Sequence, residues 1–388
     1  MDADAPLSID PATRLLVLSP GQQLSMKLCF EYAARVSASD LLITAGSPPV
    51  VRVIGDLMAM TDVPLRPEDS RRLVFSLLNE TQQEMFERKK ELDFSLAVTG
   101  NLRFRANIYY QKGAVSAAFR LIPTAIPAIE QLGLPPEIKA LTMKNNGLLL
   151  VTGPTGSGKS TTLAALIDVI NAHKRCHIVT VEDPIEYLHL SKRAVIDQRE
   201  VYADTLSFAN ALKYVLRQDP DVILVGEMRD LETISAALTA AETGHLVLAT
   251  LHTNDAVQSI DRIVDVFPPH QHDQVRTQLA FCLLGVLSQQ LIPRADGKGR
   301  VMCYEFMVKN HAVAAHIREG KTHQTRSVLE TSKDEGMISM DKKLKELYEA
   351  ELIAWEEVER RVSHPAFLKI INRRLDFAAF APLAEEQR

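Results

Sequence analysis

The sequence has no long hydrophobic run and no secretion signal. Nowhere do its 388 residues approach the ~18 consecutive apolar residues that a membrane-spanning helix needs. The opening residues, MDADAPLSID, carry neither a basic segment nor a long apolar segment, which argues against a signal peptide. Internal repeats and low-complexity tracts are missing too. These absences predict a cytoplasmic protein.

Cysteine is also scarce, and there is no excess of basic charge. The four cysteines are far apart and form no CxxC pair, which argues against a zinc site and against a disulfide framework. We expect reduced, mostly buried thiols at Cys29, Cys176, Cys282 and Cys303. Lysine and arginine number 44 against 49 acidic residues, so the net charge of −5 gives no general attraction to nucleic acid, although a local basic patch stays open.

The length predicts two to three domains of about 150 residues each, and the first is a small α+β domain. We expect a loosely ordered leader over residues 1–20 and this domain over residues 21–123. Its predicted helices cover residues 22–36, 67–78 and 81–90, and its predicted strands cover 41–44, 50–54, 92–98, 102–110 and 115–122. Lys112-Gly113 is typical of a hairpin turn.

The rest of the chain has the pattern of an α/β fold. Prolines mark residues 124–134 as a linker. Over residues 135–309, strongly apolar runs alternate with helical patterns, which predicts parallel strands covered by helices on both faces. We expect a helical region over residues 310–365 and a tail over 366–388 that ends in a disordered polar stretch.

Residues 153–160 read GPTGSGKS and fit the phosphate-binding pattern GxxxxGK[ST]. An apolar run precedes the motif and a helical pattern follows it. Backbone N–H groups at the helix N-terminus would therefore surround the phosphates of ATP. Lys159 would place a positive charge on the β- and γ-phosphates, and the Ser160 hydroxyl would bind Mg²⁺. The candidate nucleotide-binding residues are Gly153, Pro154, Thr155, Gly156, Ser157, Gly158, Lys159, Ser160 and Thr161.

Three later apolar runs also end in polar residues. Because ligands bind at the carboxyl ends of parallel strands, we expect these polar residues to gather near the nucleotide phosphates. They are Glu182 and Glu186 after the first run, Glu227 after the second and His252 after the third.

Glu227 is the candidate for the second acid of the nucleotide site, where it would hold Mg²⁺ or polarise the attacking water. Asp221 is of a suitable type but begins its strand, at the wrong edge. Glu186 is the candidate general base, because Pro184 prevents an ordinary helix and lets the loop project the carboxylate. Glu182 is nearly as suitable, and a structural ion pair is the alternative for Glu186.

Two histidines flank the third run. His252 is a candidate sensor of the γ-phosphate, and His245 is a candidate nucleotide contact, with ordinary packing as the alternative for each. The strand between them would separate them by ~23 Å, so they cannot share a metal ion. No metal beyond Mg²⁺ is expected.

Arg103 and Arg105 lie two apart in a predicted strand and face the same side, and Arg120 lies in the next strand. Arginine stays charged and binds phosphate oxygens through a rigid fork. These three arginines are therefore candidate fingers that reach a nucleotide across a domain or subunit boundary. A solvent-facing basic strand face is the alternative.

Four motifs, in this order, resemble those of the secretion ATPase superfamily and, within it, the retraction ATPases of type IV pili (PilT and the related PilU). They read GPTGSGKST at 153–161, TVEDPIEY at 180–187, DPDVILVGEMRD at 219–230 and TGHLVLATLHTN at 243–254. The resemblance covers roughly residues 22–365. By position in these motifs, Glu186 matches the catalytic glutamate of the family and Glu227 its Walker B glutamate, while Arg103, Arg105 and Arg120 match its N-terminal arginines.

The resemblance implies a PAS-like N-terminal domain and a RecA-like ATPase domain in a homohexamer. It implies ATP and Mg²⁺ as cofactors and pilus retraction, hence twitching motility, as the work. It also implies an inner-membrane pilus platform protein as a partner, with a second retraction ATPase as a further one. The motor would then lie at the inner face of the cytoplasmic membrane.

Two segments depart from the retraction family. Its AIRNLIRE motif corresponds here to AVAAHIRE at 312–319, in which the ends match and the middle does not. Its SDLHL segment reads SDLLI at 39–43, without the histidine, as in PilU-type proteins. The lack of CxxC pairs separates the chain from pilus-extension and type II secretion ATPases, which usually carry a zinc-binding insertion, and favours retraction.

Three alternatives stay open. An accessory motor of PilU type would hydrolyse ATP weakly alone and faster with a partner ATPase. A RecA-like nucleic-acid motor would share the phosphate chemistry, but the chain shows no basic run with interleaved aromatics. A non-catalytic scaffold is disfavoured by the intact set of Lys159, Ser160, Glu186 and Glu227.

Overall fold

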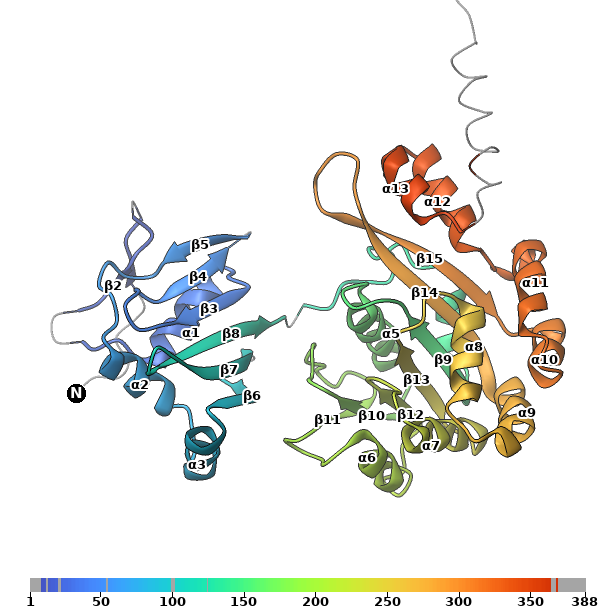
Figure 1. The fold of residues 1–388 in the computed structure, drawn as a ribbon, viewed down its shortest axis with the longest axis horizontal. Helices are drawn as coiled ribbons and strands as arrows, with labels where there is room; N and C mark the ends of the chain where they lie inside the picture. The colour runs from blue at the N-terminus through green and yellow to red at the C-terminus, as the bar shows by residue number, and fades with distance from the viewer. Residues whose placement is uncertain are drawn as a thin grey trace, which may run out of the picture. The chain divides into compact units, whose positions relative to one another are not determined.

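The computed structural model describes residues 8–363, apart from positions 12, 20–21, 54, 99–101 and 124, together with Leu368. The chain forms two compact units, Met1–Ala125 with Glu186–Leu188, and Ile126–Ile185 with His189–Arg388 (Figure 1). Apart from Leu368, the tail predicted over residues 366–388 lies outside the described residues.

The N-terminal unit is built around a six-stranded antiparallel sheet in the order β5-β4-β3-β8-β7-β6. Its strands are β3 (Asp40–Ile43), β4 (Val50–Val53), β5 (Asp56–Ala59), β6 (Glu91–Ala97), β7 (Arg103–Gln111) and β8 (Ala114–Ile122). Its helices are α1 (Met26–Arg35), α2 (Pro67–Phe75) and α3 (Glu80–Lys89). They contact β3, β8 and β6, respectively.

One face of this sheet forms the core of the unit. Phe30 of α1 is buried between Phe104 of β7 and Phe119 of β8, with ring centroids 4.4 and 5.1 Å apart. Such aromatic pairs add about 0.5–1.5 kcal/mol beyond the burial of their area. Because side chains alternate along a strand, the burial of Phe104 places Arg103 and Arg105 on the opposite face.

Within the leader predicted over residues 1–20, the described residues from Ser8 onward contain two short strands. Strands β1 (Ser8–Ile9) and β2 (Leu16–Val17) pair as a short antiparallel hairpin. Leu16 is buried, and its N–H donates to the carbonyl oxygen of Met60 at 2.7 Å. The Tyr32 hydroxyl also donates to the Arg14 carbonyl at 2.5 Å. An apolar side chain and backbone hydrogen bonds therefore fix this segment to the unit.

In this unit one predicted turn is confirmed, and one strand was not predicted. The hairpin turn at Lys112-Gly113 is confirmed, because both residues have positive φ, 49° and 80°, as a two-residue turn between β7 and β8 requires. Strand β5 was not predicted. It is an edge strand with mostly exposed side chains, so it lacks the alternating pattern of a half-buried strand.

The C-terminal unit is built around a seven-stranded sheet in the order β11-β10-β12-β13-β9-β14-β15. All neighbours are parallel except β14 and β15. The strands are β9 (Gly147–Thr152), β10 (His177–Glu182), β11 (Val195–Glu200), β12 (Val222–Val225), β13 (Leu246–Leu251), β14 (Leu283–Pro293) and β15 (Arg300–Val308). Strands β11, β14 and β15 were not predicted from the sequence.

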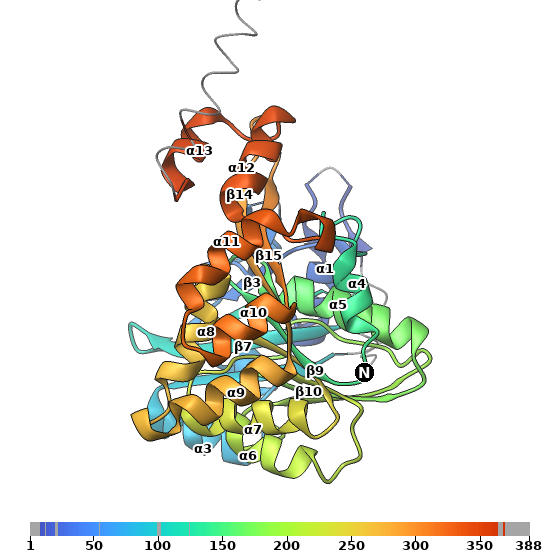
Figure 2. The same ribbon diagram turned by 90° about the vertical axis from the view of Figure 1, so that its right-hand side faces the viewer.

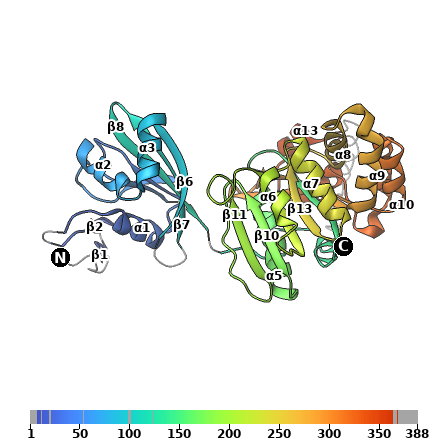
Figure 3. The same cartoon turned by 90° about the horizontal axis from the view of Figure 1, so that it is seen from below.

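Helices cover both faces of this sheet. In β9, Leu149 and Val151 face the core that contains α5 (Lys159–His173), whereas Leu148 and Leu150 face the opposite core. Figure 3 shows α5 on one face of the sheet, with α6 (Phe208–Val215) and α7 (Leu231–Glu242) on the other. The prediction of apolar parallel strands covered on both faces is confirmed, and the fold is mixed α/β.

Further helices flank the sheet. They are α4 (Glu137–Thr142), α8 (Ala256–Asp265), α9 (His272–Cys282), α10 (His311–Arg318), α11 (Thr325–Thr331), α12 (Met340–Glu349) and α13 (Trp355–Arg361), with 3-10 turns at Pro269–Gln271, Thr322–Gln324 and Lys333–Glu335. Helix α10 packs beside α9, and α12 packs against β15 (Figure 2). Within the described part of the chain, no helix combines the length and apolar character needed to cross a membrane.

All four cysteines are free thiols, and most are buried, as predicted. Burial raises the pKa of Cys29, Cys282 and Cys303 to about 12. Cys176 is only partly buried, and its pKa is raised by burial and by the charge of Asp221.

Candidate functional site

The predicted phosphate loop, residues 153–160, connects the carboxyl end of β9 to the first turn of α5. Its glycines Gly153, Gly156 and Gly158 have φ of 142°, 78° and 91°, values that favour glycine. A Cβ atom on Gly153 would lie 2.3 Å from the carbonyl oxygen of Gln289, so no other residue fits there. The predicted strand–loop–helix context is therefore present, with the loop at the N-terminus of a 15-residue helix.

Lys159 and Ser160 occupy the first turn of α5. The Lys159 ammonium donates hydrogen bonds to the carbonyl oxygens of Gly153 at 2.7 Å and Pro154 at 3.1 Å. Partial burial lowers the pKa of Lys159, and the charge of Glu227 opposes this change. The side chain of Ser160 is exposed at the helix start, where its hydroxyl is accessible.

Gln289 of β14 braces the phosphate loop, and the sequence analysis missed it. Its side chain is fully buried. The amide Nε2 donates to the carbonyl oxygen of Ser157 at 2.8 Å, and the Thr162 hydroxyl donates to its Oε1 at 2.9 Å. One carboxamide therefore holds the loop and the helix that follows it. Only the pairing of β14 with β9 points to this role, because the residue belongs to no motif.

The structure brings Glu227 and His252 together. The sheet order places β12, β13 and β9 side by side, so the residues that follow them share one edge. His252 Nε2 lies 3.1 Å from Glu227 Oε1. The charge of Glu227 also acts to raise the pKa of Lys159, against the effect of burial. Asp221 lies at the other edge, where its carboxylate accepts a hydrogen bond from the His177 N–H at 2.8 Å.

Glu227 has a second partner that the sequence analysis did not single out. Arg229 donates from Nε to Glu227 Oε1 at 2.5 Å and from Nη2 to Oε2 at 2.7 Å. Burial alone would raise the pKa of Glu227, but Arg229 and His252 outweigh it and hold the pKa below its ordinary value. The carboxylate is therefore kept ionised, as an acid that holds Mg²⁺ must be.

The two remaining acids lie at and beyond the carboxyl end of β10. Glu182 accepts hydrogen bonds from the Thr180 hydroxyl at 2.7 Å and from Gln198 Nε2 at 3.2 Å. Glu186 follows the cis Asp183-Pro184 bond and is exposed. The prediction that Glu186 acts as base rests on its place in the loop after β10.

His245 lies apart from the other candidate residues of this sheet. It precedes β13, and its Nδ1 lies 3.0 Å from the carbonyl oxygen of Ala240 at the end of α7. The six residues of β13 separate it from the edge of the phosphate loop by about 20 Å. This position at the opposite edge of its own sheet favours the packing alternative for His245.

The three arginines lie on the face of the N-terminal sheet opposite its hydrophobic core. Arg105 of β7 and Arg120 of β8 are direct register partners, and both are exposed. Arg120 Nε lies 3.0 Å from Asp40 Oδ1, and Arg52 Nε lies 3.7 Å from Asp40 Oδ2. No motif points to Asp40, which only the pairing of β3 with β8 places beside Arg120. Arg103 is half-buried two positions before Arg105.

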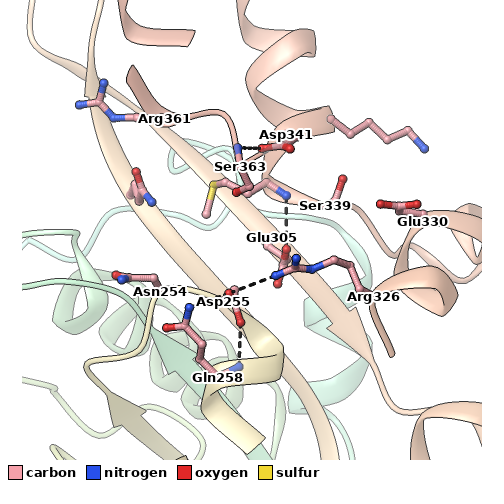
Figure 4. Close-up of a pocket in the computed structure, with 13 residues that line it drawn as sticks. Asn254, Asp255, Gln258, Glu305, Arg326, Glu330, Ser339, Asp341, Arg361 and Ser363 are labelled. Carbon is pink, nitrogen blue, oxygen red and sulfur yellow. Dashed lines mark hydrogen bonds and ion pairs between the residues drawn. The ribbon is translucent and has the colours of Figure 1, made fainter. Parts of the chain in front are cut away.

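A cavity of about 470 Å³ lies beside the loop that follows His252. Figure 4 shows side chains from the start of α8, from β15 and from α11 and α12 around it. Glu305 accepts hydrogen bonds from the N–H groups of Ala256 at 2.9 Å and Met340 at 3.5 Å, the first residues of α8 and α12. Arg326 lies 3.7 Å from Asp255. The cavity thus lies between the segment after β13 and the C-terminal helices.

The chain is similar to known proteins along most of its length. Residues 24–364 match the family described as type II/IV secretion system protein. The chain is 47% identical to the type IV pilus retraction ATPase PilT of Pseudomonas aeruginosa over 86% of its length and 97% of that protein. It is 43% identical to the type IV pilus ATPase PilU of the same organism, over 82% of the chain and 84% of that protein.

A solved structure extends the comparison to three dimensions. The crystal structure of the pilus retraction motor PilT with bound ADP matches with a TM-score of 0.84 and 47% identity, over 90% of this chain and all of that chain. The family match spans most of the described residues and includes both units. The chain belongs to the type II/IV secretion system protein family, the secretion ATPases.

Proposed function

We propose that this protein is a Mg²⁺-dependent ATPase that works as a homohexameric motor and powers type IV pilus retraction, the movement behind twitching motility. One observation carries the proposal: the phosphate loop, Glu227 and His252 follow three adjacent parallel strands at one edge of the sheet. The 47% identity to a protein described as a type IV pilus retraction ATPase supports the same work for this chain.

The candidate residues have distinct roles in the proposed reaction. Backbone N–H groups of the phosphate loop bind the ATP phosphates at the N-terminus of α5, and Lys159 compensates the charge on the β- and γ-phosphates. Glu186 accepts the proton of the attacking water. Glu182 is less suited to this role, because Thr180 and Gln198 already donate to it.

The residues present fit Mg²⁺. This ion keeps several waters, binds phosphate oxygens and needs only one or two protein oxygens. Ser160 and Glu227 would hold it, because the first has an exposed hydroxyl at the helix start and the second is a partly buried carboxylate whose pKa is lowered. When bound, Mg²⁺ neutralises charge on the phosphates.

The domain assignments and the assembly are part of the proposal. We assign a PAS-like domain to residues 21–123, a linker to 124–134, a RecA-like core to 135–309 and a helical region to 310–365. Arg103, Arg105 and Arg120 reach a nucleotide across a unit or subunit boundary. A ring of six then transmits hydrolysis at one site to its neighbour. The TM-score of 0.84 to a retraction motor supports this assignment.

The proposed setting is the cytoplasmic face of the inner membrane. The motor contacts the inner-membrane platform protein of the pilus, and a second retraction ATPase is a further partner. An accessory role of PilU type is the second candidate, favoured by the SDLLI segment at 39–43 and by 43% identity to PilU. An accessory motor hydrolyses ATP weakly alone and faster with its partner ATPase.

Deletion of the gene, followed by imaging of surface pili, tests the proposal. Retraction predicts excess pili, restored to normal by the wild-type gene and by Lys298→Ala, which changes an exposed lysine in the turn between β14 and β15. The Lys159→Ala gene should restore nothing, and its purified product should hydrolyse Mg²⁺-ATP at least ~10²-fold more slowly. Missing pili after deletion would identify an extension motor and refute retraction.

A further inference from the structure

The loop between β12 and α7 is fixed at three points. The Gly226 N–H donates to the Val181 carbonyl oxygen at 2.8 Å, and the Met228 N–H donates to the Thr250 carbonyl oxygen at 3.1 Å. Asp230 then caps α7 by accepting a hydrogen bond from the Thr233 N–H at 2.8 Å. The loop is thus tied to β10 on one side and β13 on the other.

This loop presents Arg229 to Glu227. The guanidinium forms the two hydrogen bonds to the carboxylate. The pKa of Arg229 is raised by the hydrogen bond to Glu227, by the charge of Glu227 and then by Asp183 and Tyr202.

A guanidinium group can bind one carboxylate through two parallel hydrogen bonds, an arrangement called a fork. Its two parallel N–H groups define the plane of the carboxylate they bind, which a lysine ammonium cannot do. Each carboxylate oxygen accepts two hydrogen bonds, so Glu227 Oε2, which Arg229 contacts once, keeps capacity for water or another ligand. Oε1 contacts both Arg229 and His252. The fork therefore sets which lone pairs of Glu227 stay open.

We propose that Arg229 is a positioning residue for hydrolysis, which holds the plane of the Glu227 carboxylate. The inference rests on the proposed ATPase function. It assigns Arg229 no contact with the nucleotide. Arg229 therefore acts on turnover far more than on nucleotide affinity.

A purely structural role for Arg229 would predict that its removal lowers the thermal unfolding midpoint. The Arg229 side chain is 74% exposed, and exposed ion pairs contribute little to stability. Removing it should leave folding intact. The chain also offers a matched control: Arg294 forms the same fork with Asp296, two residues away, in the turn between β14 and β15.

The experiment compares Arg229→Gln, Arg229→Lys and Arg294→Gln in the full-length protein. Three quantities are measured: ATP turnover at saturating Mg²⁺-ATP, affinity for ADP without Mg²⁺, and the thermal unfolding midpoint. We expect Arg229→Gln to lower turnover about tenfold or more, because charge-assisted hydrogen bonds are lost, while ADP affinity changes less than about threefold. Arg229→Lys should recover only part of the turnover, and Arg294→Gln should match the wild type.

Three outcomes would overturn the inference. Arg229→Gln could turn over ATP as fast as Arg294→Gln, which would leave the fork without a role. It could lose ADP affinity as much as turnover, which would make Arg229 a binding residue. Arg229→Lys could be fully active, which would show that charge alone suffices. A wild-type protein without ATPase activity would refute the proposed function instead, so the two failures are distinguishable.

Discussion

The side-chain amide of Gln289 donates a hydrogen bond to the carbonyl oxygen of Ser157 at 2.8 Å and thereby links β14 to the phosphate loop. The same amide accepts a hydrogen bond from the Thr162 hydroxyl. The loop conformation thus depends on a residue 132 positions away in the chain. We therefore expect nucleotide binding to weaken when Gln289 is replaced.

Gln289→Leu introduces an apolar side chain of similar size and leaves the Ser157 carbonyl and the Thr162 hydroxyl without their partner. An unsatisfied buried polar group costs about 1–3 kcal/mol. We expect nucleotide affinity to fall about tenfold and the unfolding midpoint to fall by several degrees. Isothermal titration with ADP and thermal unfolding measure the two effects. The control is Gln290→Leu, one position on and facing the cavity, and equal affinity in both variants would contradict the prediction.

Glu186→Gln should keep nucleotide affinity and lose hydrolysis by about 10²-fold or more, because the amide preserves shape and cannot accept a proton. Glu182→Gln is the matched comparison, and it should retain most turnover, since Glu182 is already bonded to Thr180 and Gln198. Turnover and ADP affinity are measured on both variants. Normal turnover in Glu186→Gln would move the role of base to Glu182, and loss of affinity as well would indicate a structural role.

Arg105→Ala and Arg120→Ala should each lower turnover by about tenfold or more without abolishing the proposed hexamer, because the proposal has the arginines compensate phosphate charge in a closed arrangement. Asp40→Asn should have a smaller effect, since it only releases Arg120 from its ion pair. Oligomer mass and ATPase rate are measured, beside mixed rings that contain Lys159→Ala subunits. Full activity of both arginine variants, or full activity of a dilute wild-type monomer, would rule out the coupling.

His177 should make stability depend on pH. Burial lowers its pKa, but hydrogen bonds to Asp197 and to the carbonyl oxygens of Asp219 and Gln218 outweigh burial and raise the pKa above 6.5. Because the folded-state pKa is raised, the stabilisation is fully present below the unfolded-state pKa. It is lost as the pH rises from about 6.5 through the folded-state value.

Thermal unfolding from about pH 6 to about pH 8 measures this dependence. We expect His177→Gln to lower the midpoint by at most a few degrees at the acid end and to leave it unchanged at the alkaline end. His173→Gln, at an exposed histidine of α5, is the control. Equal curves for wild type and His177→Gln would show that the pair with Asp197 contributes nothing.

The sequence predicts best those elements whose signal is local. The apolar runs of β9, β12 and β13 and the glycines of the phosphate loop need only neighbouring residues to be recognised, so the shared edge of Glu227 and His252 could be predicted. Strand β11 was missed because its sequence, VIDQRE, is mostly polar at a sheet edge.

Residues that depend on strand pairing could not be predicted. Gln289 reaches Ser157 only because β14 pairs with β9, and Asp40 reaches Arg120 only because β3 pairs with β8. No motif or spacing encodes these registers. The motif alone could not place His245 either, since the extended strand β13 holds the two ends of that motif apart.

The buried thiols have a practical consequence. Only the thiolate reacts rapidly with maleimides, and Cys29, Cys282 and Cys303 are inaccessible and have pKa values of about 12. Replacing the partly exposed Cys176 by serine should therefore give a background that is almost silent to labelling. New cysteines at exposed positions of the two units, such as Glu91 and Lys298, can then carry a donor and an acceptor dye. Energy transfer between the dyes would follow the two units in real time while ATP is consumed.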